Sequence, residues 1–373
     1  MADSDSDDDS DAESCGRAED PTHLAPFAVS PTPFEKLSCL GEGAFGAVWL
    51  ARCRETGRNV ALKEVPRHLA DPRLLHPERD VLREVAQSKE RGASVSPALT
   101  ALVSSFATSF AICLAMELVE GAHLLEHVRA AACLPEPQAQ WYAAEIAGAL
   151  RWLHAAGWLY RDLKLTNVMV SVSEESFGRV KLIDYGFAFN GSWCDKAVGT
   201  LRTMAPEVIC CADGTWLENL RSAHPCFAAL TGYSPAADWW SLGVVLYEML
   251  TGQPPFGHQD DLVLEGLQAL QAQLASPGLP WPSDCTASSA AKEAADSFCQ
   301  INPADRLGFG VEVRHKEFFA SVDWDAVDSH GARGPSFDTT LGHTAASAAA
   351  DPCRPRRGAL PVQCEEPDPF ADW

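Results

Sequence analysis

Apolar and polar positions along the chain follow two different patterns. From Phe34 to about Val119, short apolar runs such as Val48–Ala51 and Val60–Leu62 are separated by turn-forming residues at 55–57. Short runs bounded by turn residues are typical of strands. Residues 76–85 interrupt them with a helical stretch. The first part of the folded chain is therefore predicted to be β-rich, with one helix.

The later part of the chain has helical periodicity. From Gln138, apolar residues recur at three- and four-residue spacing, which predicts a long amphipathic helix. These residues are Tyr142, Ile146, Leu150 and Leu153. The stretch Ala236–Leu250 is almost continuously apolar and predicts a buried helix. The two patterns together predict an α+β fold, with a small β-rich lobe followed by a larger α-helical lobe.

Both ends of the chain differ from this folded part. Residues 1–20 contain nine Asp or Glu and one Arg, so they have little to bury, and we predict a disordered acidic tail. Serines 4, 6, 10 and 14 suit an acid-directed kinase; the alternative is a plain solvated segment. Residues 328–368 are rich in small and polar residues and predict an extended tail. Phe370 and Trp373, in contrast, indicate docking into a pocket.

Composition excludes several classes of partner. The chain has 29 basic and 51 acidic residues, a net charge of −22, which argues against nucleic acid or an anionic membrane as the main partner. Its 13 cysteines lack clustered ligand spacing and predict reduced thiols. The acidic start does not resemble a secretory or transit peptide. The uncharged stretch 93–116 is broken by Pro97 and predicts core strands rather than a membrane span. We expect a cytoplasmic protein, with the nucleus as a second location.

A glycine-rich segment is the first candidate for chemistry. Gly41, Gly43 and Gly46 precede Val48 in the pattern G-x-G-x-x-G-x-V. Glycines allow a tight hairpin to bring backbone N–H groups close to phosphate oxygens. The same pattern occurs in dinucleotide-binding folds. Lys63, at the end of the next apolar run, favours a hairpin over phosphates, because this lysine can neutralise the α- and β-phosphates.

Lys63 needs an acidic partner, and the following helical stretch offers two. If Glu78 faces the site, the residue four positions on is Leu82, which is apolar, as packing between lobes requires. For Glu84 the corresponding residue is Ser88. We therefore predict that Glu78 pairs with Lys63 and that Glu84 is solvated.

Four polar residues on two loops complete the set of candidate phosphate-handling residues. Asp162, Lys164 and Asn167 lie within one short segment, and Asp184 follows 17 residues after Asn167. Phosphoryl transfer requires an aligned nucleophile and neutralised phosphate charge. Asp162 can accept the proton of a hydroxyl, and Lys164 can stabilise the transferred group. Asn167 and Asp184 supply the oxygen ligands that Mg²⁺ prefers.

These segments resemble the catalytic and metal-binding loops of protein kinases. The resemblance extends to Ala205-Pro206-Glu207, to Asp238 in a buried Asp-Trp-Trp helix, and to Arg306, which in such proteins pairs with Glu207. It implies the bilobal protein kinase fold, with ATP and Mg²⁺ as cofactors. Lys164 and Thr200 resemble the Ser/Thr branch rather than the Tyr branch.

Finer features are similar to the AGC group, in particular to the cAMP-dependent kinase catalytic subunit and the cGMP-dependent kinase catalytic domain. They are Tyr160, the Asp-Trp-Trp helix, His315–Phe319 and the terminal Phe370-x-x-Trp373. The resemblance implies that the terminal aromatics fold back onto the small lobe and brace the Glu78 helix. It also implies protein substrates, basic ones among them, and a regulatory subunit acting in trans.

The resemblance further implies how the nucleotide is bound. Residues 116–121 would form the adenine-binding hinge. The implied nucleotide-binding set is Leu40, Gly41, Glu42, Gly43, Ala44, Phe45, Gly46, Val48, Ala61, Lys63, Glu78, Met116, Glu117, Val119 and Met169. The implied organisation is an acidic tail at 1–33, a kinase domain at 34–319 and an AGC-type C-terminal tail at 320–373.

The activation segment departs from the AGC pattern. AGC kinases usually carry a phosphorylatable Thr three residues before the Gly-Thr pair, and this chain has Lys196 there. Such a phosphate normally pairs with the arginine before the catalytic acid, here Arg161. We predict that Asp195 supplies a weaker, permanent negative charge to Arg161. The alternative is that other packing orders the loop.

Substrate contacts also depart from the pattern of basic-directed relatives. His123 and Thr166 stand where acids are expected, although Glu248 is retained and Glu120 is a substitute. Leu201 and Met204 predict an apolar pocket for the residue after the phosphoacceptor.

The segment 208–237 is about twenty residues longer than that of the relatives. It carries Trp216, Leu217, Leu220 and Phe227, which favour either partner binding or local packing.

The sequence thus predicts a Ser/Thr protein kinase that transfers the γ-phosphate of ATP to protein hydroxyls. The competing hypothesis is a catalytically weak scaffold of the same fold, acting through its acidic tail and its insertion.

Overall fold

The computed structural model describes residues 32–43, 46–211, 227, 231–257, 278–336, 370 and 373. The acidic tail, Ala44 and Phe45, most of the 208–237 insertion and the extended segment before Phe370 lie outside these residues. The predictions made for those parts therefore stay predictions.

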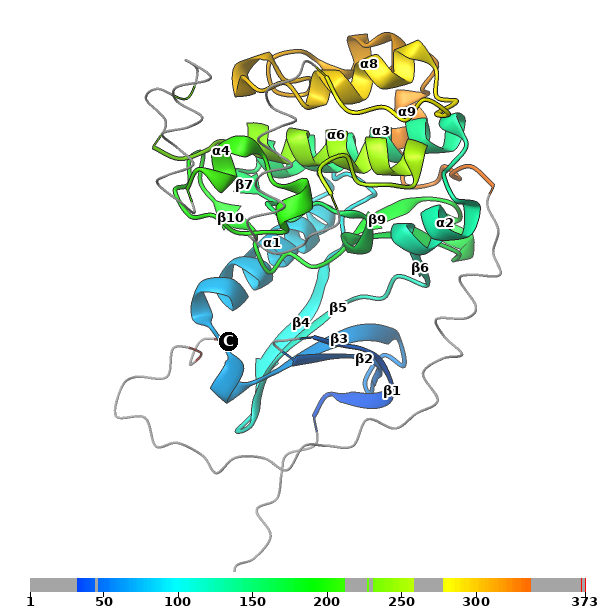
Figure 1. The fold of residues 1–373 in the computed structure, drawn as a ribbon. Coiled ribbons are helices and arrows are strands. Elements are labelled where there is room, and N and C mark those ends of the chain that lie inside the picture. The colour runs from blue at the N-terminus through cyan, green and yellow to red at the C-terminus, as the bar shows by residue number, and fades with distance from the viewer. Residues whose placement is uncertain are drawn as a thin grey trace, which may run out of the picture. The chain divides into compact units, whose positions relative to one another are not determined.

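A five-stranded antiparallel sheet forms the first part of the fold, in the order β1-β2-β3-β5-β4 (Figure 1). Its strands are β1 Phe34–Gly43, β2 Gly46–Cys53, β3 Asn59–Pro66, β4 Leu102–Ala107 and β5 Ala111–Glu117. Alternate residues face opposite sides of a strand, and β3 shows this clearly. Val60 and Leu62 are buried in the core of the sheet, whereas Ala61 and Lys63 on the other face are only partly buried. The predicted strands are confirmed.

Helix α1 (Pro72–Glu90) accompanies this sheet. Asp71 caps its N-terminus by accepting a hydrogen bond from the Arg73 N–H, and Pro72 occupies the first helical position, where its missing N–H costs nothing. The buried face of the helix carries Glu78 and Leu82 together, as the spacing predicted. The helix starts four residues before the stretch identified from the sequence.

The second part of the fold is mainly helical. Its helices are α2 Leu124–Ala131, α3 Glu136–Ala155, α4 Pro206–Ile209, α6 Ala236–Thr251, α8 Ser289–Phe298 and α9 Trp324–Asp328. Its short strands are β6 Gly121–His123, β7 Trp158–Leu159, β8 Val168–Ser171, β9 Val180–Leu182 and β10 Phe189–Asn190. Strands β6, β8 and β9 form one sheet, and β7 pairs with β10. The predicted α+β, two-lobed fold is confirmed.

Helix α6 is the centre of the helical lobe, between α3 and α8 (Figure 1). Every residue from Ala236 to Leu250 is buried, so the helix has no polar face toward solvent. The predicted amphipathic helix is α3, whose four marker residues are all buried against this core. Among the described residues, no helix is both long and apolar enough to cross a membrane.

A buried ion pair holds α4 against the rest of the helical lobe. Arg306 donates to both carboxylate oxygens of Glu207, with one N–O distance of 2.8 Å, and both side chains are almost completely buried. Arg306 also donates to the Ala236 carbonyl at the start of α6 (3.0 Å). The pairing predicted from the resemblance is confirmed. It fixes the end of the activation segment to α6.

The terminal aromatics pack onto the sheet lobe, as the resemblance implied. Phe370 is 5% exposed and joins a cluster with Leu75 of α1 and Ile112 of β5. Trp373 donates from its indole nitrogen to the Cys113 carbonyl (3.2 Å) and lies 4.7 Å from the Arg79 guanidinium in a cation–π contact. These contacts connect α1 with β5 of the sheet.

Truncating this contact should weaken the sheet lobe. Because Phe370 is buried, Phe370→Ala is expected to lower the free energy of unfolding by about 2–3 kcal/mol, below the usual cost in a large core, because its cluster has four buried residues among those described. Thermal unfolding followed by circular dichroism measures this change. Phe110→Ala, at a 64% exposed position of the same lobe, is the matched control and should change stability little. Equal effects of the two variants would contradict the docking.

Candidate active site

The loop between β7 and β8 is held by one buried carboxylate. Asp238, 1% exposed in the first turn of α6, accepts hydrogen bonds from the backbone N–H groups of Tyr160 (2.9 Å) and Arg161 (2.7 Å). The same carboxylate also contacts Nε2 of His154 (2.8 Å). Arg161 has φ of 70°, an unfavourable value for a residue with a side chain, so this loop depends on these contacts. The next residue is Asp162.

The Asp162 carboxylate contacts the other residues of the predicted catalytic loop and Thr200. One carboxylate oxygen accepts from the Thr200 hydroxyl (2.7 Å), and the other contacts Lys164 Nζ (2.8 Å) and Asn167 Nδ2 (2.9 Å). Lys164 also donates to the Thr200 hydroxyl (2.8 Å). A Cβ at Gly199 would lie 2.4 Å from the Arg161 carbonyl, so only glycine lets Thr200 approach this closely.

The two predicted metal ligands suit a hard cation. The Asn167 amide nitrogen makes both of its hydrogen bonds to Asp162, which leaves the amide oxygen on the other side for a ligand. Asp184 is half exposed, and its φ of 57° turns it out of the strand direction. Partial burial raises its pKa, but Lys63 and the Gly186 N–H outweigh this effect and keep the pKa below its usual value.

In such a site, Mg²⁺ requires only a few ligands from the protein. Among the described residues, no group of three or more His, Cys, Asp or Glu is placed to hold a metal. Mg²⁺ commonly binds one or two protein oxygens together with substrate phosphates and waters. Asn167 and Asp184 therefore fit a cation that arrives with a nucleotide, not a preformed metal cage.

Lys63 is held in place by Glu78, as predicted. Its Nζ lies 2.7 and 2.8 Å from the two carboxylate oxygens of Glu78 and 3.5 Å from Asp184. Burial lowers the pKa of Lys63, but these two carboxylates raise it above its ordinary value, so the lysine is charged. Glu84 instead lies at the surface and pairs with Arg91 (3.1 Å). The choice of Glu78 over Glu84 is confirmed.

The walls of the predicted nucleotide site come from both lobes. Val48 lies opposite Lys63, and Ala61 opposite Met116, in the paired strands β2, β3 and β5. Met169 lies on β8 of the helical lobe. These side chains, with Val119, are partly buried, which leaves apolar surface for an aromatic ring.

The glycine-rich strand lies beside this wall. Leu40, Gly41, Glu42 and Gly43 are exposed along β1, and β1 pairs with β2 as far as Gly46. A Cβ at Gly46 would lie 2.1 Å from the Glu64 carbonyl, so the close approach of β2 to β3 requires glycine there.

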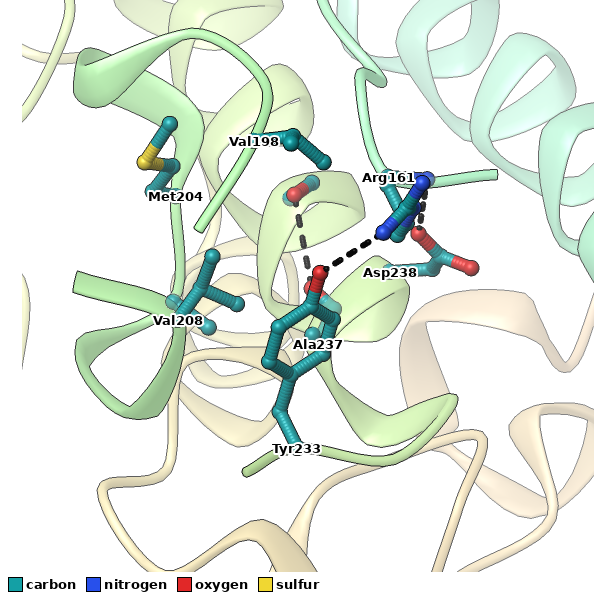
Figure 2. Close-up of a pocket in the computed structure, with 9 residues that line it drawn as sticks. Arg161, Val198, Met204, Val208, Tyr233, Ala237 and Asp238 are labelled. Carbon is teal, nitrogen blue, oxygen red and sulfur yellow. Dashed lines mark hydrogen bonds between the residues drawn. The ribbon is translucent and has the colours of Figure 1, made fainter. Parts of the chain in front are cut away.

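Arg161 does not pair with Asp195, and that prediction is wrong. The Asp195 carboxylate is 66% exposed and lies 3.8 Å from Lys196 Nζ. The Arg161 guanidinium instead donates to the Tyr233 hydroxyl, as Figure 2 shows, and to Cys194 Sγ. The backbone of Cys194 pairs with that of Tyr233 in an antiparallel bridge, which turns the Cys194 side chain inward. Neighbouring side chains of an extended segment point to opposite sides, so Asp195 points outward.

The predicted substrate contacts are placed as follows. Leu201 and Met204 are both 6% exposed and therefore line the interior below the activation segment. His123 and Thr166 are partly buried at the start of α2 and in the catalytic loop. Two further predicted positions are Glu248, buried within α6, and Glu120, exposed before β6.

In the insertion, Phe227 is fully buried, which agrees with a local packing role for that residue.

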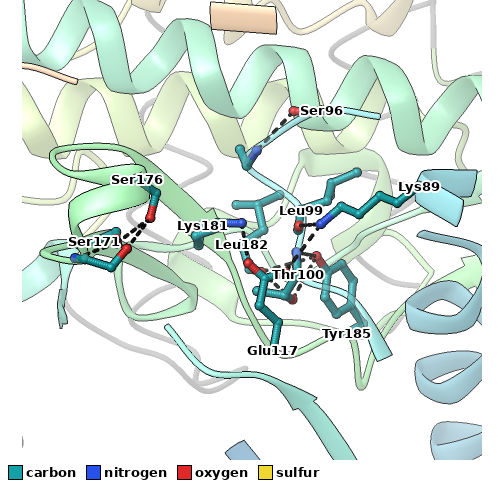
Figure 3. A network of polar contacts seen from close by, with 12 residues as sticks. Lys89, Ser96, Leu99, Thr100, Glu117, Ser171, Ser176, Lys181, Leu182 and Tyr185 are labelled. Carbon is teal, nitrogen blue, oxygen red and sulfur yellow. Dashed lines mark hydrogen bonds and ion pairs between the residues drawn. The ribbon is translucent and has the colours of Figure 1, made fainter. Parts of the chain in front are cut away.

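Glu117, one of the predicted nucleotide-binding residues, has its carboxylate engaged in an ion-pair cluster. Lys181 Nζ lies 2.5 Å and Lys89 Nζ 3.3 Å from its oxygens (Figure 3). Lys89 also donates to the Leu99 carbonyl (3.2 Å). The three charges connect α1, the hinge and β9. Sequence reasoning missed both lysines, because their spacing to Glu117 carries no motif.

This charge cluster predicts a pH dependence of stability. Burial raises the pKa of Glu117, but Lys181 and Lys89 outweigh this effect and hold the pKa below its usual value. A depressed native pKa stabilises the fold at pH values above the unfolded pKa, and the contribution is lost as pH falls through the native pKa. Glu117→Gln should therefore lower the free energy of unfolding at neutral pH, and the difference from wild type should shrink as the pH falls through the native pKa of Glu117. Chemical denaturation across this pH range measures it.

The control for this test is Glu84→Gln, because Glu84 is a more exposed acid paired with a single arginine. It should change stability little at neutral pH. A destabilisation by Glu117→Gln that grows toward acidic pH would contradict the assigned role.

Comparisons with known proteins agree with this geometry. A family model described as protein kinase domain matches residues 34–319. The RAC-beta serine/threonine-protein kinase A of Xenopus laevis is 33% identical over 307 residues, which cover 80% of this chain and 56% of that protein. The RAC-beta serine/threonine-protein kinases of Homo sapiens and Rattus norvegicus are each 32% identical with the same coverage.

The chain spans little more than half the length of these curated relatives. The similarity they show is to RAC-beta kinases, and the finer similarity to the cyclic-nucleotide-dependent kinases stays a prediction. The family match covers most of the chain and includes every element that carries the site. The chain therefore belongs to the protein kinase family.

Proposed function

We propose that this protein is a Ser/Thr protein kinase that transfers the γ-phosphate of ATP to serine or threonine hydroxyls of protein substrates. The observation that carries the proposal is the assembled set around Asp162. Its carboxylate contacts Thr200, Lys164 and Asn167 at once, while Lys63 is already paired with Glu78. A catalytically weak scaffold would not need all of these contacts together.

Each group has a defined task in the proposed reaction. Asp162 orients the substrate hydroxyl and accepts its proton as the oxygen bonds to the γ-phosphorus. The bond between the γ-phosphorus and the β–γ bridging oxygen breaks, and ADP leaves. Lys63 neutralises charge on the α- and β-phosphates, and Lys164 does so on the transferred group. Asn167 and Asp184 would hold Mg²⁺, which neutralises phosphate charge when bound.

The contact between Lys164 and Thr200 favours hydroxyls on short side chains. The Lys164 ammonium and the Thr200 hydroxyl lie 2.8 Å apart and contact the Asp162 carboxylate at 2.8 and 2.7 Å. The phosphoacceptor must therefore approach this carboxylate closely beside them. A serine or threonine backbone can do so, and the longer tyrosine side chain would hold its backbone further away. This geometry supports the Ser/Thr assignment.

The subtype belongs to the same proposal. The docked Phe370 and Trp373 support an AGC kinase of the cAMP-dependent type, with a kinase domain at 34–319 and a C-terminal tail at 320–373. Basic protein substrates, a regulatory subunit in trans and a cytoplasmic and nuclear location follow from that resemblance. We make these proposals from the resemblance together with the aromatic docking.

Replacing Lys63 tests the proposed activity. Lys63→Met removes the cation and leaves Glu78 buried without its partner, so the rate of phosphate transfer should fall by about 100-fold or more. Lys36→Met is the matched control, because Lys36 lies on the neighbouring β1 and pairs with Glu64 at the surface. The measurement is incorporation of labelled phosphate from radiolabelled ATP into a positional peptide library in the presence of Mg²⁺.

The library also tests substrate choice. Labelling restricted to Ser- and Thr-containing peptides, with selection of basic residues near the acceptor, would support the proposal in full. No labelling by the wild type, or equal labelling by Lys63→Met, would overturn the kinase assignment. Selection without basic residues would overturn only the proposed substrate class.

A further inference from the structure

The arginine beside the catalytic acid is surrounded by neutral groups. Arg161 donates from Nε to the Phe187 carbonyl (2.5 Å) and from one terminal nitrogen to Cys194 Sγ and the Tyr233 hydroxyl, both at 3.2 Å. Its guanidinium also lies 5.1 Å from the centre of the Phe189 ring. Within the described residues, no carboxylate lies within ion-pair distance of this guanidinium.

Tyr233 links this arginine to the activation segment. Its hydroxyl accepts from Arg161 and donates to the Lys196 carbonyl at 2.7 Å, so its hydrogen and a lone pair are both used. Its backbone exchanges two hydrogen bonds with Cys194, at 2.8 and 2.9 Å. Tyr233 and Cys194 are 1% and 5% exposed, so these contacts are shielded from water.

The position of these bonds matters for catalysis. Lys196 occupies the place where a phosphorylatable threonine is usual in AGC kinases, and its carbonyl is the group that Tyr233 holds. The cavity bordered by Arg161, Val198 and Tyr233 has a volume of about 10 Å³, room for no more than one water molecule. This cavity is too small for a phosphate while Tyr233 lies beside Arg161 (Figure 2).

We propose that Tyr233, together with Cys194, is a positioning residue of the active site that replaces an activation-segment phosphate with neutral hydrogen bonds. The inference rests on the proposed kinase function. The hydroxyl and the thiol hold the Arg161 guanidinium, the guanidinium holds the carbonyl of Phe187, and the backbone of Arg161 sets the direction of Asp162. The end of the 208–237 insertion, which carries Tyr233, thereby supports the catalytic loop.

A tyrosine-to-phenylalanine exchange isolates the hydroxyl. Tyr233→Phe should lower kcat about tenfold while the KM for ATP stays nearly constant, because the nucleotide contacts lie elsewhere. Tyr247→Phe is the matched control: Tyr247 is 3% exposed on α6 and its hydroxyl donates to the Pro280 carbonyl (2.6 Å), away from the site. It should leave kcat unchanged, as should Asp195→Asn.

A double-mutant cycle separates positioning from a general structural role. If Tyr233 acts through Arg161, then Tyr233→Phe should have no further effect on kcat in an Arg161→Ala background. Cys194→Ser retains a hydrogen-bond acceptor and should keep most of the activity that Cys194→Ala loses. Additive effects of Tyr233→Phe and Arg161→Ala, or wild-type kcat for Tyr233→Phe, would overturn the inference.

A readout without catalysis keeps this test independent of the kinase assignment. Amide hydrogen exchange of residues 187–196 should be faster in Tyr233→Phe than in wild type, and unchanged in Tyr247→Phe. An inactive wild type with this exchange pattern would refute the proposed function but keep the role of Tyr233. An unchanged pattern would refute that role.

Bacterially made protein should be active with no phosphate on its activation segment by mass spectrometry. A large gain in kcat on phosphorylation there would overturn the inference.

Discussion

The buried carboxylate of Asp238 is the constraint on which the site depends. An isolated charge in the interior is costly unless hydrogen bonds satisfy it. Asp238 satisfies this need with the N–H groups of Tyr160 and Arg161 and with His154. Its place in the first turn of α6 adds the favourable field of a helix N-terminus. The catalytic loop must therefore adopt one backbone path, including the unfavourable φ of Arg161, and that path fixes the position of Asp162.

The sheet lobe is connected to the helical lobe through charged side chains along α1. Glu78, near the middle of the helix, holds Lys63, and Lys89, near its end, reaches the hinge carboxylate of Glu117. Lys181 contacts the same carboxylate from the helical lobe. Trp373 adds a cation–π contact with Arg79 of the same helix. The position of α1, and with it Lys63, is therefore set jointly by both lobes and by the end of the chain.

The sequence predicted those features that depend on short-range patterns of apolar and polar residues. The strands, the long helix α3 and the buried helix α6 follow from periodicity, and Glu78 was separable from Glu84 because Leu82 shares its face. The failed prediction concerns direction: sequence places Asp195 near Arg161 but does not say which side chain of an extended segment turns inward. That choice depends on the bridge between Cys194 and Tyr233, two residues 39 positions apart in the chain. Such long-range pairing carries no motif.

The size of the interactions explains how a neutral partner can serve where a phosphate is usual. A hydrogen bond from a charged donor contributes about 1.5–3 kcal/mol, and about 5.5 kcal/mol moves a two-state equilibrium from 1:99 to 99:1. Arg161 makes three such bonds to neutral acceptors. Three bonds of this size together are of the order needed to keep the segment ordered. A phosphate adds a larger attraction that a phosphatase can remove, whereas a tyrosine hydroxyl gives a smaller one that is always present. The geometry around Arg161 therefore favours constant order over switching.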